Sequence, residues 1–317
     1  MSYLTSSLPD CVNAGLFEGN EMITSQKAAV IGAGTMGMGI AEVLCSKGFD
    51  VSLYSRSERT LDVARQHLGS DVTRVHFTTS IEACVGNASV VSENVAEDLE
   101  LKSSLFSMVE GIVGRNCILT TNTSSVPIGS IAVLMRDPSR LVGLHWFNPP
   151  AVMPLLEIVR GPATSDAVIQ SVREFAASIG KETIEVHSDL PGFVINRLQY
   201  ALMREAMHLV ETGVASAQDV DRAVETTLAS RWSSAGPLKL MDLAGLDTVE
   251  KVSGILMPEL NNGGNVPAIV KKLVSEGAFG TKSGRGFYEW TPELASEVKA
   301  KRDETVKLLS SRRNTAP

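Results

Sequence analysis

The sequence predicts an α/β fold in which a doubly wound, mostly parallel sheet is followed by an all-helical C-terminal domain. Short apolar segments alternate with amphipathic ones over about 160 residues from Lys27, which is typical of a parallel sheet covered by helices on both faces. The pattern becomes purely helical after Pro191. The length of 317 residues corresponds to about two domains of ordinary size.

The sheet domain is expected over residues 27–187. Its strands should be the short apolar runs bounded by glycine, proline or polar residues, at 28–31, 51–54, 75–78, 89–92, 118–121, 141–146, 155–159 and 183–186. Helices with an apolar face are predicted between them at 34–47, 60–68, 99–113 and 165–179. Gly48 and Gly180 follow two of these helices, as expected for C-terminal caps.

The helical domain is expected over residues 188–317. Phe193, Leu198 and Leu202 fall close to helical spacing, and the stretches 217–228, 266–276 and 292–311 have the same pattern. Residues 1–26 are mixed and polar, with neither an apolar signal core nor the arginines of a transit peptide. We expect this N-terminal extension to be a frayed tail or to precede a start at Met22. The alternative is a regulatory or oligomerisation arm.

Composition excludes several classes of protein. Lysine and arginine number 29, and aspartate and glutamate 36, so the net charge of −7 argues against a nucleic-acid-binding surface. No apolar run reaches the roughly 18 residues of a membrane span. The cysteines at 11, 45, 84 and 117 form neither a C-x-x-C pair nor a cluster with histidine, so no metal site and no disulfide framework are predicted. A cytoplasmic protein fits best.

A glycine-rich turn follows the first strand and opens the first helix. It reads Gly32-Ala33-Gly34-Thr35-Met36-Gly37. The first glycine permits a tight turn, the second lets a pyrophosphate approach, and the third lets helix and strand pack closely. The helix N-terminus then offers amide groups and a partial positive charge to the phosphates. Gly32, Gly34, Thr35, Met36 and Gly37 are therefore predicted to bind a dinucleotide in a Rossmann-type domain. The alternative is merely a tight turn.

The ribose of the coenzyme should be recognised at the end of the second strand. An acidic residue there would accept hydrogen bonds from the 2′-hydroxyl of NAD, but this chain has Ser55-Arg56-Ser57. Ser55 and Arg56 can instead hydrogen-bond and neutralise a 2′-phosphate, so NADP is slightly favoured over NAD. In the alternative, Arg56 is a solvated surface residue, and Glu58 or a backbone group serves the ribose of NAD.

Polar residues at the ends of later strands are candidates for catalysis. His145 ends a predicted apolar strand, where a histidine is suited to proton transfer near neutral pH. Glu157, twelve residues later (157 − 145), can lie on a neighbouring strand and fix the imidazole tautomer. Ser124 and Asn148 can hydrogen-bond a substrate oxygen. On these residues alone, a hydrogen-bonded core histidine is an equally good interpretation.

Taken together, the motifs resemble the 3-hydroxyacyl-CoA dehydrogenase family over about residues 27–290. The resemblance rests on the glycine-rich turn, on Glu97 and Lys102 before a helix, on residues 122–125 (Asn-Thr-Ser-Ser), and on residues 145–149 with Glu157. It extends to residues 191–197 (Pro-Gly-Phe-Val-Ile-Asn-Arg) and 282–288 (Lys-Ser-Gly-Arg-Gly-Phe-Tyr). The combination is far more specific than any one motif.

The resemblance implies a role for each matching residue. His145 would be the general base, or the acid in the reverse direction, and Glu157 would orient and charge-stabilise it. Ser124 and Asn196 would hydrogen-bond the substrate oxygen. Coenzyme contacts would come from Glu97, Lys102, Asn148 and Lys282. The coenzyme handles the hydride, so no metal is needed, and the helical domain would mediate a homodimer.

Departures from the family pattern bear on the substrate. The acyl-CoA members have a long helical hairpin between the second and third strands that contacts CoA, whereas residues 56–74 hold a single predicted helix. The stretch 148–150 (Asn-Pro-Pro) and Arg231-Trp232 are more similar to members acting on small free acids, such as gulonate and carnitine dehydrogenases and lambda-crystallin. Arg231 would then clamp a substrate carboxylate. Its alternative is an ion pair within the helical domain.

The sequence therefore predicts an NAD(P)-dependent oxidoreductase that interconverts a 3-hydroxy acid or acyl group and its 3-oxo form. A small free acid is favoured over a CoA ester as the small-molecule substrate. The alternatives are a 3-hydroxyacyl-CoA dehydrogenase proper, such as a 3-hydroxybutyryl-CoA dehydrogenase, an aldehyde-oxidising dehydrogenase of a ring carboxylate, and a non-catalytic, crystallin-like coenzyme binder. Intact Ser124, His145, Glu157 and Asn196 argue against the last.

Overall fold

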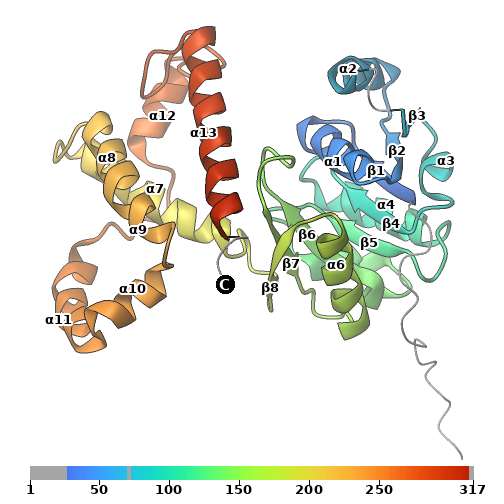
Figure 1. Ribbon diagram of the computed structural model, residues 1–317, viewed down its shortest axis with the longest axis horizontal. Helices are drawn as coiled ribbons and strands as arrows, with labels where there is room; N and C mark the ends of the chain where they lie inside the picture. Colours follow the sequence, from blue (N-terminus) through green and yellow to red (C-terminus); the bar gives the residue numbers. More distant parts are fainter. Residues whose placement is uncertain (1–26, 70–72, 314–317) are drawn as a thin grey trace, which may run out of the picture.

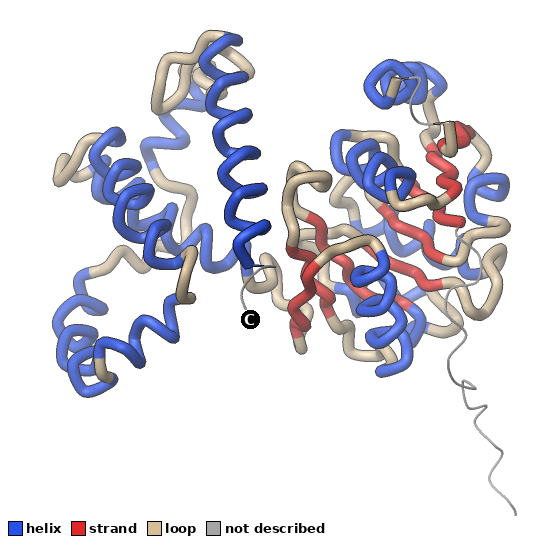
Figure 2. Tube along the Cα trace, viewed as in Figure 1, coloured by secondary structure: helices blue, strands red, loops and turns tan. Residues whose placement is uncertain are grey.

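The computed structural model describes residues 27–69 and 73–313, so the expectation for residues 1–26 lies outside the described residues. A sheet with helices on both faces forms one lobe and a group of helices forms the other (Figure 1). Among the described residues, strands occur only in the first lobe (Figure 2). The predicted α/β domain followed by a helical C-terminal region is confirmed.

The sheet has eight strands in the order β3-β2-β1-β4-β5-β6-β7-β8. Their bounds are β1 Lys27–Ile31, β2 Asp50–Tyr54, β3 Val75–Thr78, β4 Val90–Glu93, β5 Ile118–Thr121, β6 Leu141–Trp146, β7 Leu155–Val159 and β8 Glu182–Val186. All neighbouring strands are parallel except β6 and β7, which are antiparallel. The strand order reverses direction between β1 and β4, and ligands of open α/β sheets bind at such a point.

Helices cover both faces of the sheet and bury its apolar side chains. One face packs against α1 (Thr35–Ser46), α2 (Glu58–Leu68) and α6 (Asp166–Ser178). The other packs against α3 (Ile81–Val85), α4 (Leu99–Glu110) and α5 (Ile128–Ile131). The short helices α3 and α5 were not predicted, because four or five residues are too few to establish helical periodicity. As predicted, α2 is the single helix between β2 and β3 in the described residues.

The second lobe consists of α7 (Ile195–Glu211), α8 (Ala217–Ala223), α9 (Ser230–Trp232), α10 (Pro237–Ala244), α11 (Leu246–Leu256), α12 (Ala268–Ser275) and α13 (Pro292–Arg313). A π-helical segment, Val224–Ala229, joins α8 to α9, so the predicted helix 217–228 is not one regular helix. None of the helices α7 to α12 contains a buried residue. The apolar faces of this lobe therefore lie open in the single chain.

Candidate active site

The glycine-rich turn joins β1 to α1 at the switch point of the sheet. A methyl group at Gly37 would lie 1.8 Å from the carbonyl oxygen of Gly32, so helix and strand could not pack as they do. A methyl group at Gly34 would meet nothing within 4 Å. The amides of Thr35, Met36 and Gly37 have no acceptor among the residues that the structure describes. Open space beside free amides at a helix N-terminus fits a dinucleotide pyrophosphate.

The end of β2 offers hydroxyl groups and a cation rather than a carboxylate. The Ser55 side chain accepts a hydrogen bond from the Ser57 amide at 3.3 Å. Arg56 is exposed, and none of the carboxylates in the described ranges pairs with it. Glu58, the alternative ribose acceptor, forms an ion pair with Arg65 at 2.8 Å. Arg56 therefore offers a cation without an ion-pair partner in the described ranges directly after Ser55.

His145 and Glu157 form a buried pair near the carboxyl end of β6. They face each other in the antiparallel register of β6 and β7, and His145 Nδ1 lies 2.6 Å from Glu157 Oε2. His145 is 5% exposed and Glu157 is fully buried. A carboxylate at Nδ1 favours the tautomer with its proton there, which leaves Nε2 free to accept a proton. Nε2 has no partner within residues 27–69 and 73–313.

The segment 192–195 brings the second lobe to this pair. The Gly192 amide donates to the carbonyl oxygen of Ser124 at 3.1 Å. The Phe193 ring packs edge-on against the His145 ring, with centroids 5.5 Å apart. Asn196 follows as the second residue of α7. Residues 192–195 therefore contact Ser124, His145 and Glu157. They lead directly into Asn196, the fourth predicted catalytic residue.

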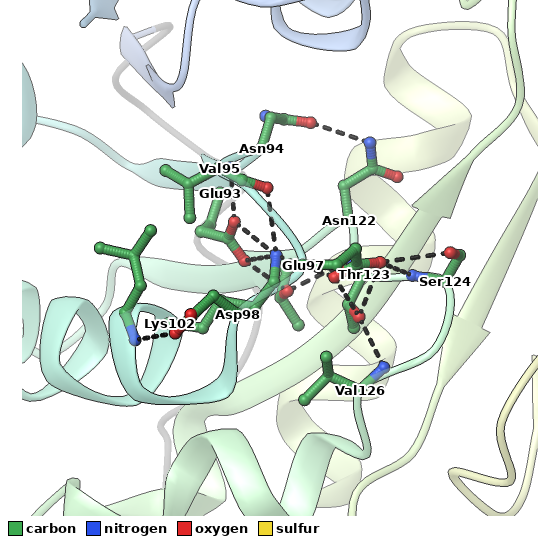
Figure 3. A network of polar contacts seen from close by, with 12 residues as sticks. Glu93, Asn94, Val95, Glu97, Asp98, Lys102, Asn122, Thr123, Ser124 and Val126 are labelled. Carbon is green, nitrogen blue, oxygen red and sulfur yellow. Dashed lines mark hydrogen bonds and ion pairs between the residues drawn. The ribbon is translucent and has the colours of Figure 1, made fainter. Parts of the chain in front are cut away.

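A network of charged and polar groups links the ends of β4 and β5 (Figure 3). The fully buried Glu93 carboxylate accepts from Lys102 Nζ at 2.8 and 3.0 Å and from the Thr121 hydroxyl at 2.6 Å. Lys102 Nζ also lies 3.3 Å from Glu97. Glu97 in turn accepts from the Ser124 amide at 2.7 Å and from its hydroxyl at 3.2 Å. Lys102 is 1% exposed, so it would not touch a coenzyme directly and would act on it through Glu97.

The carboxyl group of Glu97 is held in its ionised form. Its partial burial favours the neutral acid, but the Ser124 amide, the Lys102 ammonium and the Thr123 hydroxyl outweigh this, so the pKa of Glu97 lies below its ordinary value. The network contains two carboxylates and one ammonium. It therefore presents a net negative charge beside Ser124.

Two residues of the site were not predicted. Glu93 could have been noticed as a charged residue ending the otherwise uncharged, buried strand β4. Lys181 Nζ donates to the carbonyl oxygens of Pro150 and Met153 at 2.6 and 2.7 Å, which fixes the loop after β6. Burial, together with Lys47, lowers the pKa of Lys181 to about 8. No local pattern marked Lys181, because its partners are carbonyl groups of a distant loop.

Three predicted residues stand apart from the buried pair. Asn148 is exposed in the loop after β6. In the second lobe, Arg231 is exposed, and its Nε donates to the Thr227 carbonyl oxygen at 3.3 Å. No described carboxylate pairs with Arg231, so the alternative of an ion pair finds no partner within the described ranges. Lys282 is exposed in the segment after α12, and it forms no hydrogen bond or ion pair with the sheet lobe in those ranges.

The described residues contain neither a candidate membrane span nor a candidate metal site. No helix among them is both long and apolar enough to cross a membrane. No group of three or more His, Cys, Asp or Glu side chains there is arranged to hold a metal ion.

Known proteins match almost the whole chain. Residues 27–190 match the 3-hydroxyacyl-CoA dehydrogenase NAD binding domain, and residues 192–290 match the C-terminal domain of the same family. The 5-formyl-3-hydroxy-2-methylpyridine 4-carboxylate 5-dehydrogenase of Mesorhizobium japonicum is 35% identical over 300 residues, covering 90% of this chain and 96% of that protein. A 3-hydroxybutyryl-CoA dehydrogenase of Mycobacterium tuberculosis is 34% identical over 286 residues, covering 84% and 98%.

Solved structures agree with these matches. The crystal structure of a 5-formyl-3-hydroxy-2-methylpyridine 4-carboxylic acid 5-dehydrogenase, described as an NAD+ dependent dismutase, has a TM-score of 0.84 at 34% identity and covers 92% of this chain and 98% of that one. The (S)-3-hydroxybutyryl-CoA dehydrogenase of Ralstonia eutropha has a TM-score of 0.68 at 30% identity, covering 84% and 100%. With its glycine-rich turn and buried His145–Glu157 pair, the chain belongs to the 3-hydroxyacyl-CoA dehydrogenase family of NAD-dependent oxidoreductases.

Proposed function

We propose that the protein oxidises a hydroxyl group of a compact, carboxylated 3-hydroxy acid to the oxo group, or catalyses the reverse reduction. The observation that carries this proposal is the buried His145–Glu157 pair with its 2.6 Å contact. When bound, the nicotinamide coenzyme would supply hydride acceptance. The chain itself would bind the substrate beside the His145–Glu157 pair and move the proton.

Proton transfer is assigned to His145. Its Nε2 takes the hydroxyl proton while Glu157 holds Nδ1–H and balances the imidazolium charge. Ser124 and Asn196 hold the substrate oxygen, and Glu97, Lys102, Asn148 and Lys282 serve the coenzyme side. His145→Ala should lower kcat by about 100-fold or more, the scale of a general base, with coenzyme affinity nearly unchanged. Near-normal turnover of this variant would refute the assignment.

A small free acid is proposed over a CoA ester. In the described residues, α2 is the single helix between β2 and β3, where the acyl-CoA members have the hairpin that contacts CoA. Without this hairpin the chain has less surface to hold a CoA nucleotide, which supports the free acid. The exposed Arg231, without a carboxylate partner among the described residues, supports a clamp for a substrate carboxylate. Steady-state kinetics on 3-hydroxybutyryl-CoA, 3-hydroxybutyrate and a panel of sugar, amino and ring acids test the proposal. Arg231→Ala should raise KM for the acid far more than for a neutral analogue. A wide preference for the CoA ester would reject it.

A second candidate is the oxidation of an aldehyde on a ring carboxylate. Its support is the similarity to the pyridine carboxylate dehydrogenase, with a TM-score of 0.84 over 92% of this chain. A hydrated aldehyde carries a hydroxyl group, so His145 could act on it as it would on an alcohol. Including aromatic aldehyde acids in the panel separates the two candidates.

For the coenzyme we propose that NADP binds more tightly than NAD. The support is the exposed Arg56 beside Ser55, while the rival acceptor Glu58 is paired with Arg65. Arg56→Ala should weaken NADP selectively, and Ser55→Asp should shift preference towards NAD by repelling the 2′-phosphate. Equilibrium titration of the unaltered protein with both coenzymes decides the matter. A clear preference for NAD would refute the proposal.

We also propose that the helical part, residues 188–317, mediates a homodimer. Residues 27–187 would hold the coenzyme. We propose a cytoplasmic location for the enzyme. Leu238, Leu243 and Ile255 are 75%, 79% and 71% exposed, and an apolar cavity of about 480 Å³ lies among α7, α8 and α12. Apolar patches of this kind mark association surfaces. Sedimentation should give a dimer that Leu243→Glu weakens. A monomeric wild-type protein at micromolar concentration would contradict this.

A further inference from the structure

The Glu157 carboxylate has more partners than its pairing with His145 requires. Oε2 lies 2.6 Å from His145 Nδ1. Oε1 accepts the backbone amides of Val194 and Ile195 at 3.0 and 2.8 Å. These amides open α7, in the other lobe, and Asn196 is the next residue. One fully buried carboxylate therefore contacts both the proposed base, His145, and the start of α7, the helix that carries Asn196.

Glu157 serves as the N-terminal cap that α7 lacks locally. Val194 precedes α7 and provides no side-chain cap. By contrast, α2, α4, α6 and α8 each follow a serine or aspartate whose side chain accepts a helix amide. The first amides of a helix need an acceptor, and their partial positive charge favours an anionic one. The carboxylate of Glu157 meets both needs from 37 and 38 residues away in sequence.

The chain before α7 adopts a conformation that aims these amides at Glu157. Phe193 has φ of +46°, the one positive value of a residue other than glycine in the described ranges. Such a conformation is strained and persists only where its surroundings hold it. Phe193 is 3% exposed and packs against His145, while the Gly192 amide donates to the Ser124 carbonyl. The connection is therefore fixed on the groups of the site.

We propose that Glu157 is a positioning residue for Asn196 as well as for His145. Its two oxygens set the distance between the base and the amide that holds the substrate oxygen. This inference rests on the proposed function for the roles of His145 and Asn196. A displacement of about 1 Å between reacting groups can reduce the rate about 100-fold, so one carboxylate shared by both groups matters for catalysis.

Two substitutions separate the roles of the two oxygens. In Glu157→Gln, the single acceptor oxygen can stay on the α7 amides while the NH₂ donates to Nδ1. This keeps the cap but places the imidazole proton on Nε2, where it prevents proton acceptance. We expect kcat to fall by about 100-fold or more with KM nearly unchanged. In Glu157→Ala both oxygens are lost, so KM should also rise, about tenfold, as it does in Asn196→Ala.

Hydrogen exchange of the 191–198 peptide provides a readout that needs no substrate. Exchange should be unchanged in Glu157→Gln and at least about tenfold faster in Glu157→Ala, also in a His145→Ala background where the pair no longer exists. If Glu157→Ala does not fold, Glu157→Asp, which is too short to reach both partners, replaces it. Equal KM values for the alanine and glutamine variants, or unchanged exchange in Glu157→Ala, would overturn the inference. Failure of the proposed reaction alone would leave the exchange result intact.

Discussion

Replacing Lys102 by methionine should destabilise the sheet lobe strongly. The ammonium of Lys102 is 1% exposed and supplies two of the contacts of the fully buried Glu93 carboxylate, at 2.8 and 3.0 Å. Methionine fills a similar volume without the charge. The substitution therefore leaves Glu93 charged, buried and without its counter-ion, with Glu97 close by.

The magnitude follows from what remains around Glu93. Removing one partner of a buried ion pair costs about 3–5 kcal/mol, because the other charge is left uncompensated. Glu93 keeps the Thr121 hydroxyl at 2.6 Å and the Val95 amide at 2.7 Å. We therefore expect the lower part of that range, about 3 kcal/mol.

Urea unfolding followed by circular dichroism at one protein concentration measures this loss. The double variant Glu93→Gln/Lys102→Met removes both charges of this buried pair and should recover most of the stability, to within about 1–2 kcal/mol of the wild type. Arg65→Met, which removes exposed ion pairs with Glu58 and Asp62, is the control and should hardly move the midpoint. A loss below about 1 kcal/mol in Lys102→Met, or a double variant less stable than that single one, would refute the reasoning.

Three further predictions follow from the same geometry. Gly34→Ala should leave thermal stability unchanged but weaken coenzyme binding in a titration, because its methyl group enters open space, whereas Gly37→Ala should lower stability by clashing with the Gly32 carbonyl. The lowered pKa of Glu97 stabilises the fold fully above the unfolded value of about 4.5, and this contribution is lost as the pH falls through the folded value. Urea midpoints measured against pH should therefore show a shallower acid loss in Glu97→Gln, and an identical loss would contradict this. Lys181 has its pKa lowered from 10.5 to about 8, so stability should rise with pH between these values. Lys181→Met should remove that rise, which a parallel alkaline series can check.

Local patterns in the sequence determined most of the sheet lobe. The strands at 75–78, 118–121, 141–146 and 155–159 begin and end where the apolar runs do. The glycine-rich turn follows β1 as predicted, because tight turning and close packing demand glycine at fixed spacing. Periodicity and turn chemistry act between near neighbours, and the sequence displays them directly.

Contacts between distant segments were decided only by the tertiary structure. The sequence identified Glu157 as a partner of His145, but not the amides of Val194 and Ile195 on its other oxygen. It indicated Lys102, but not Glu93, the buried carboxylate that forms an ion pair with that lysine. Strand order and register determine which side chains of the sheet meet. The helices and connecting segments then pack against the sheet. A buried charge is stable only where several segments supply its partners. The partners of Glu93 and Glu157 can therefore be identified only after these segments have packed together.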